Sequence, residues 1–109
     1  MTDSIRSVFT IESEATPQGR TIRPVGELDI AAVEQFGDAL AQATHSDAPA
    51  VLLDLGAVTF IDSAGVRSIL QAVAASQANA NKLRVGRAVS EPVARLFELI
   101  GATDRLPYA

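Results

Sequence analysis

LDLGAVTFIDSAGVRSIL, residues 53–70, joins an apolar run to an apolar-striped helix through a short loop. The run that leads into it, Val51 to Leu55, is almost continuously apolar, which is typical of a strand covered on both faces in a parallel sheet. After the loop, apolar side chains recur at positions 66, 69, 70 and 73, the spacing of an amphipathic helix. This strand–helix unit, followed by a short apolar strand at residues 83–85, predicts an α/β fold with a right-handed parallel crossover.

The flanking segments extend the pattern in both directions. Residues 8–11 and 21–25 are β-prone, and Pro17 and Gly19 between them predict a hairpin turn at residues 15–19. Pro24 indicates an edge strand or a bulge. Residues 26–29 read as a loop, in which Asp29 can cap a helix with an apolar stripe from residue 32 to residue 43.

The last third of the chain predicts one more helix, with its stripe at residues 93–100. Ser90 is suited to its N-terminal cap and Gly101 to its C-terminal cap. Residues 106–108 are expected to add a short edge strand. We therefore expect a single domain, residues 1–109, in which a mixed four- to five-stranded β-sheet carries three or more α-helices.

Composition excludes several classes of function. The 109 residues include no cysteine and one histidine, His45, so thiolate chemistry and multi-histidine metal sites are excluded within one chain. A net charge of -4 argues against nucleic-acid binding. No apolar run approaches the roughly 18 residues of a membrane span, and the first six residues lack a signal peptide's apolar stretch. We expect a cytoplasmic protein with no cofactor, no metal and no membrane partner.

The charge is unevenly divided along the chain. Residues 1–62 hold 10 acidic and 3 basic residues, whereas residues 63–109 hold 3 acidic and 6 basic residues. An acidic front half could attract a basic patch on a partner. Folding could equally interleave these charges and leave no patch.

Ser63 is the residue on which the functional hypothesis depends. It stands at the expected N-cap of the helix that follows, where its hydroxyl could simply accept a backbone N–H. However, Ala64 and Gly65 are small and leave the hydroxyl open to another protein. The free N–H groups and positive dipole end of a helix N-terminus also tolerate a phosphate. The acids Glu27, Asp29 and Asp62 could end on the same edge of the sheet, where a phosphate would add further negative charge.

Three motifs together resemble the STAS-domain anti-sigma factor antagonists, also called anti-anti-sigma factors. Residues 26–29, GELD, resemble the family's signature after the second strand, and residues 60–66, FIDSAGV, resemble its phosphorylation motif. The segment from Ala88 to Gly101 is similar to the family's last large helix. These matches occur in the expected order from about residue 8 to residue 106.

The resemblance implies partner switching. The unphosphorylated protein would bind an anti-sigma factor that is also a serine kinase and would release the sigma factor for transcription. Phosphorylation of Ser63 would end that complex, and a phosphatase acting on phospho-Ser63 would reset it. The resemblance makes Ser63 the phosphoacceptor, Asp62 the acid that shapes the loop, and Glu27 and Asp29 contacts near the kinase. The full partner-binding set that it implies is Glu27, Asp29, Asp62, Ser63, Ala64, Gly65, Val66 and Arg67. We expect a monomer or a weak dimer.

Two other classes of function remain as alternatives. An enzyme is disfavoured because Ile61 replaces the first glycine of a G-x-S-x-G elbow and because no glycine-rich phosphate loop is present. Asp54 lacks the acidic pair of a receiver-type magnesium site, so we expect it to accept backbone N–H bonds beside a loop. The second alternative is a STAS domain that never switches, a structural subunit of a larger complex such as a transport-associated one. In that protein Ser63 would only cap its helix.

Overall fold

A computed structural model of the chain describes residues 9–80 and 82–109. The chain begins with the predicted hairpin, in which β1 (Phe9–Thr16) and β2 (Gly19–Leu28) pair antiparallel from Thr16↔Gly19 onward. The turn is therefore shorter, and both strands are longer, than the sequence predicted. Position 8, the predicted start of the first strand, lies outside the described residues.

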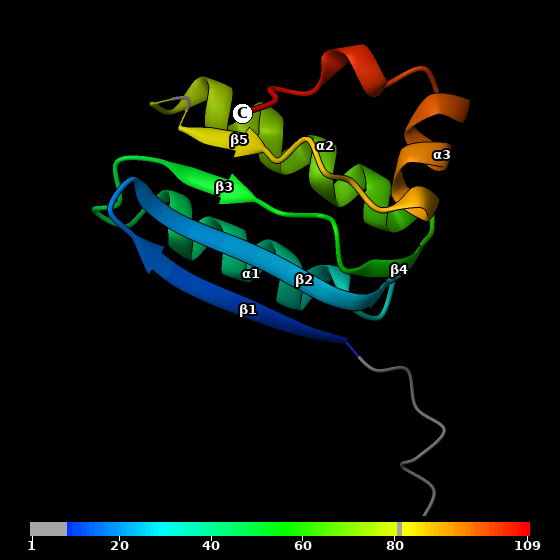
Figure 1. The fold of residues 1–109 in the computed structure, drawn as a ribbon, viewed down its shortest axis with the longest axis horizontal. Coiled ribbons are helices and arrows are strands. Elements are labelled where there is room, and N and C mark those ends of the chain that lie inside the picture. The colour runs from blue at the N-terminus through cyan, green and yellow to red at the C-terminus, as the bar shows by residue number, and fades with distance from the viewer. Residues whose placement is uncertain (1–8, 81) are drawn as a thin grey trace, which may run out of the picture.

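The sheet is mixed and has five strands, which confirms the predicted fold class (Figure 1). β3 (Val51–Leu53) pairs parallel with the first part of β2 on one side and with β5 (Leu83–Val85) on the other. β4 (Val58–Ile61) pairs parallel with the last part of β2, through Gly26↔Val58 and Leu28↔Ile61. The prediction of a loop at residues 26–29 was therefore wrong for its first three residues, because β4 supplies them with a strand partner.

Pro24 lies where β2 changes partner. The N–H groups of Arg20 and Gly26 point to this side of β2, donating to Ala50 and Ala57. Pro24 is an even number of residues from both, so its backbone nitrogen points to the same side. Its missing N–H therefore falls between the segment of β2 paired with β3 and the segment paired with β4. The edge-strand interpretation of Pro24 was wrong, since β2 is paired on both sides. The irregularity predicted as the alternative occurs nearby, between Gly26 and Glu27.

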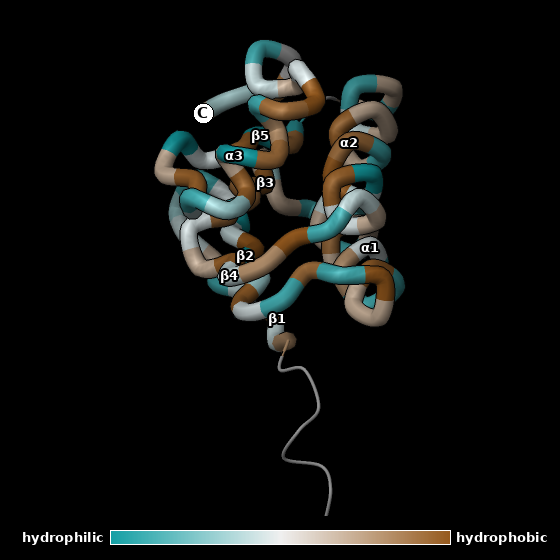
Figure 2. Tube along the Cα trace, turned by 90° about the vertical axis from the view of Figure 1, so that its right-hand side faces the viewer, coloured by the Kyte–Doolittle hydropathy of each residue, from teal (hydrophilic) through white to brown (hydrophobic). Residues whose placement is uncertain are grey.

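Three helices complete the described domain. They are α1 (Val33–Thr44), α2 (Ser63–Ala78) and α3 (Glu91–Leu99). Helices α1 and α2 lie together on one side of the sheet, and α3 packs against β4 (Figure 2). The predicted stripes supply the core, since Phe36, Ile69 and Phe97 are at most 2% exposed.

The predicted caps of the last helix are only partly confirmed. Ser90 is the N-cap of α3, but its hydroxyl makes no capping bond, and Gly101 (φ 71°) follows the C-cap residue as predicted. After a short 3-10 helix, Thr103–Arg105, the tail forms one parallel bridge, Val85↔Tyr108, rather than a strand. Among the helices of the described residues, none has the length and apolarity needed to cross a bilayer.

Candidate functional site

The site lies at the edge of the sheet where β2 and β4 both end. Because the two strands are parallel and Leu28 is in register with Ile61, the segments that follow them leave the sheet side by side. Asp29 and Asp62 are the first residues of those segments. The predicted meeting of these acids at one edge of the sheet is therefore confirmed. Glu27 lies within β2, half-buried and in register with Phe60.

Asp62 joins the two segments through its side chain. One carboxylate oxygen accepts the N–H of Gly65 at 2.9 Å, and the other accepts the N–H of Ile30 at 3.2 Å. Asp62 has extended backbone angles, whereas Ser63 is the first residue of α2. The prediction that Ser63 caps this helix was wrong. The carboxylate of Asp62, one residue earlier, already occupies the third N–H of the helix.

Replacing Asp62 and Ser63 by alanine separates these two roles. We expect Asp62→Ala to lower the free energy of unfolding by about 1–2 kcal/mol, because it removes the cap and the bond to Ile30. Ser63→Ala should change it by less than about 0.5 kcal/mol, because the serine is exposed and caps nothing. Urea denaturation of both variants checks this, and equal losses would contradict the assignment of the cap.

Asp29 shapes a turn instead of capping α1. Its side chain accepts the N–H of Ala31 at 3.1 Å, and its carbonyl accepts the N–H of Ala32 at 2.9 Å. The N-cap of α1 is Ala32, which has no side-chain capping bond. The predicted capping role of Asp29 was therefore wrong. The turn leaves Ile30 74% exposed beside Asp62.

The residues after Asp62 divide into exposed and buried positions. Ser63 and Arg67 are exposed and Ala64 is half-buried. Gly65 and Val66 are buried, since Gly65 packs so closely on β2 that a Cβ there would collide with the carbonyl oxygen of Leu28. Both residues seat α2 on the sheet, with 4% of Val66 exposed, and their place in the partner-binding set stays a prediction.

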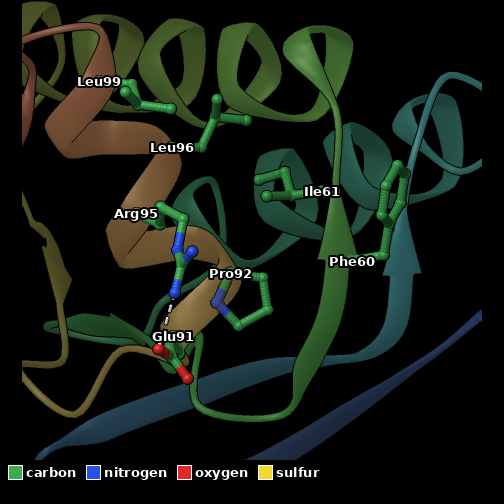
Figure 3. Close-up of a pocket in the computed structure, with 7 residues that line it drawn as sticks. All are labelled: Phe60, Ile61, Glu91, Pro92, Arg95, Leu96 and Leu99. Atoms are coloured by element: carbon green, nitrogen blue, oxygen red, sulfur yellow. Dashed lines mark hydrogen bonds and ion pairs between the residues drawn. The ribbon is translucent and has the colours of Figure 1, made fainter.

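Ser63 also borders a hollow between α2 and α3 with a volume of about 390 Å³. The hollow is lined by Ser63, Val66, Arg67, Leu70, Gln71, Ala74, Leu96 and Ile100. A second hollow, of about 400 Å³, lies between α3 and β4. Figure 3 shows Pro92 and Leu96 of α3 and Ile61 of β4 lining it, with Arg95 paired to Glu91 at 2.9 Å.

Exposed apolar side chains near this edge were missed by the sequence reasoning. Ile30, Phe60 and Leu99 are 74%, 50% and 75% exposed. Phe60 and Leu99 line the second hollow. The helical period offered a signal for two of them, since Leu99 falls outside the stripe of positions 93, 96, 97 and 100, and Ile30 precedes the stripe that starts at residue 32. Nothing in the sequence distinguishes Phe60 from its apolar neighbours Val58 and Ile61, which are buried.

The chemistry available at Ser63 is that of an accessible hydroxyl beside unsatisfied amides. Within residues 9–80 and 82–109, the N–H groups of Ser63 and Ala64 have no acceptor. An anion attached to Ser63 would meet these donors and the positive end of α2. His45 is exposed at the C-terminal end of α1, where its Nδ1 lies 2.8 Å from the carbonyl oxygen of Ala41. Asp54 accepts the N–H of Gly56 at 2.9 Å and pairs with Arg23, which confirms its predicted structural role.

Comparison with known proteins gives three kinds of result. A family model described as "Mlab, STAS domain" matches residues 11–107. A search of curated proteins finds no significant match. Among solved structures, the chain is similar to an anti-sigma factor antagonist from Mycobacterium paratuberculosis. The TM-score is 0.79 at 21% identity, over 93% of this chain and 85% of that one.

Two further structures are forms of one protein, SpoIIAA. The unphosphorylated form of this anti-sigma factor antagonist has a TM-score of 0.68 at 26% identity, covering 94% of this chain and 88% of its own. The phosphorylated form, described as a Bacillus cell fate determinant, has a TM-score of 0.65 at 26% identity, covering 94% and 91%. The sheet and helices described above therefore match the fold of these proteins.

Proposed function

The chain belongs to the STAS domain family, and on that premise we propose that it is an anti-sigma factor antagonist that switches partners. The unphosphorylated protein binds an anti-sigma factor that is also a serine kinase, and the sigma factor is released. Phosphorylation of Ser63 abolishes that binding, and a phosphatase restores it. The observation that carries the proposal is the exposed Ser63 hydroxyl at the first position of α2, bordered by the Asp29–Ile30 turn.

The similarity to SpoIIAA supports the proposal. That protein is described in both an unphosphorylated and a phosphorylated form, each aligned over 94% of this chain. Both forms share the present fold, with TM-scores of 0.68 and 0.65. A fold that persists in both states suits a switch in which the change is local charge rather than unfolding.

The geometry explains how a phosphate could be carried without loss of the fold. Asp62 already satisfies the N–H of Gly65, and the free N–H groups of Ser63 and Ala64 face the added anion. A phosphate adds about -1.5 to -2 charges beside Asp62 and Asp29. The surface offered to a partner then becomes more negative at one point, while the core beneath it is unaltered.

Incubation with candidate anti-sigma kinases and ATP tests the proposal directly. The expected result is a mass increase of about 80 Da, the mass of one phosphoryl group, located on Ser63 and absent from Ser63→Ala. Absence of the increase with every kinase encoded alongside the protein would reject the switch. That outcome favours the non-switching alternative, a structural subunit of a larger complex.

Ile30 is expected to contribute to the kinase contact, because it is an exposed apolar side chain bonded through its N–H to Asp62. Ile30→Ala should weaken binding of the anti-sigma factor by about 1–2 kcal/mol, roughly a tenfold change, with little loss of stability. Leu99→Ala is the matched control, since Leu99 is equally exposed but lines the hollow beside Phe60. Calorimetric titration compares them, and an Ile30→Ala affinity equal to that of the wild type would remove Ile30 from the interface.

A further inference from the structure

We propose that Arg67 is the positioning residue for a phosphate on Ser63, holding it through an ion pair along the face of α2. The inference rests on the proposed function, which places the phosphate on Ser63. It adds a residue of this chain that would decide where the phosphate lies.

The spacing brings the two side chains together. Ser63 and Arg67 are four residues apart in α2, so they are neighbours on one helix face, with Cβ atoms roughly 6 Å apart. Both are exposed, and both line the hollow between α2 and α3. A guanidinium at this distance can donate two parallel N–H bonds to two oxygens of the phosphate.

The guanidinium of Arg67 is available for a new ion pair. In the described ranges its side chain has no hydrogen bond or ion pair. Among the arginine and lysine side chains that the structure describes, six others have at least one such partner: Arg20, Arg23, Lys82, Arg84, Arg87 and Arg95. An unpaired guanidinium one helical turn from an exposed hydroxyl points to an anion as its partner.

The surroundings favour this pairing. Across the hollow lie the apolar side chains of Leu96 in α3 and of Ile100, its C-cap residue, and the other α2 residues that line it are uncharged. The nearby carboxylates belong to β2, the turn and the helix cap: Glu27, Asp29 and Asp62. Asp62 is bonded to Gly65 and Ile30, and Asp29 to Ala31. The phosphate would therefore meet Arg67 on one side and the amides of Ser63 and Ala64 on the other.

The test uses the full chain with phosphoserine incorporated genetically at position 63, so that no kinase is needed. A ³¹P NMR titration follows the second ionisation of the phosphate, whose pKa is ordinarily about 6. In Arg67→Gln we expect the midpoint to rise by about 0.2–0.4 pH units, because the dianion loses its cationic neighbour. Arg67→Lys should recover part of this shift. Arg95→Gln, which breaks an exposed pair on α3, should leave the midpoint unchanged.

Coinciding titration curves for the wild type and Arg67→Gln would overturn the proposal. A shift of equal size in Arg95→Gln would also overturn it, since the effect would then be one of net charge. The shift should shrink at about 1 M salt, where charges are screened within about 3 Å. Failure of kinases to modify Ser63 would reject the switch but would leave this result unaffected, so the two proposals fail separately.

Discussion

Ser63→Glu is expected to weaken capture of the anti-sigma factor by about two orders of magnitude. Two like charges about 6 Å apart at an effective dielectric constant near 20 repel by roughly 3 kcal/mol, and about 1.4 kcal/mol corresponds to a tenfold change in affinity. The exposed position of Ser63 at the start of α2 places the new carboxylate at the surface, where it would repel an acidic side chain of the partner lying opposite Ser63. A glutamate in the first turn of a helix is favourable, so the free energy of unfolding should stay within about 1 kcal/mol.

Two neutral variants make this result specific to charge. Ser63→Gln has the same bulk as Ser63→Glu and should bind nearly as well as the wild type. Ser63→Ala should also bind, and its complex should persist when ATP is added to an active kinase. Affinities from calorimetry and a pull-down with ATP provide the measurements. Equal weakening by the glutamine and glutamate variants would mean that size, not charge, decides binding. Equal capture of the wild type and Ser63→Ala in ATP would count against phosphorylation as the switch.

Gly65→Ala is expected to destabilise the protein by about 3 kcal/mol or more, although it adds only one methyl group. That methyl would collide with the carbonyl oxygen of Leu28 and would lie 2.8 Å from Cγ1 of Ile61. The Leu28 oxygen accepts the N–H of Asp62 at 3.4 Å, so moving it disturbs the pairing of β2 with β4. Relief therefore requires the first turn of α2 to lift from the sheet and to carry Ser63 with it.

Gly37→Ala is the matched control, because Gly37 lies within α1 and an added Cβ there meets nothing within 4 Å. We expect this variant to gain about 0.5–1 kcal/mol, since alanine favours a helix over glycine. Urea denaturation of the two variants should therefore give changes of opposite sign. A tolerated Gly65→Ala would show that α2 can shift on β2, and the position of Ser63 would then not be fixed by this contact.

Local sequence patterns were sufficient for the hairpin, the three helices and the parallel β3. Each of these depends on residues close together in the chain, such as the apolar spacing around Ile69. Both β4 and the end of β2 were predicted as loop. They pair with each other across more than 30 positions of the chain, and local patterns do not reveal such a pairing. The exact cap of α2 was also missed, since Asp62 and Ser63 are both suitable caps by residue type and only backbone angles distinguish them.

The motif around Ser63 identified the centre of the candidate site but not its surface. The contact of Gly65 with Leu28 fixes how α2 packs on the sheet. This packing decides which side chains between positions 62 and 67 face outward. The exposure of Ile30 depends on the turn built by Asp29, which uses hydrogen bonds that residue spacing does not reveal. The sequence therefore locates the candidate site better than it predicts which residues around Ser63 are exposed, and the role of Ser63 stays a prediction.

Since β3 and β4 follow one another along the same side of β2, the sheet consists of two short ladders that share one long strand. Proteins open locally in units bounded by such breaks in hydrogen bonding. The ladder formed by Gly26–Leu28 and β4 could release while Arg20–Ile22 stays paired to β3 and, through it, to β5. We expect amide hydrogen exchange along β2 to be faster after Pro24 than before it, with the first turn of α2 exchanging together with the faster half.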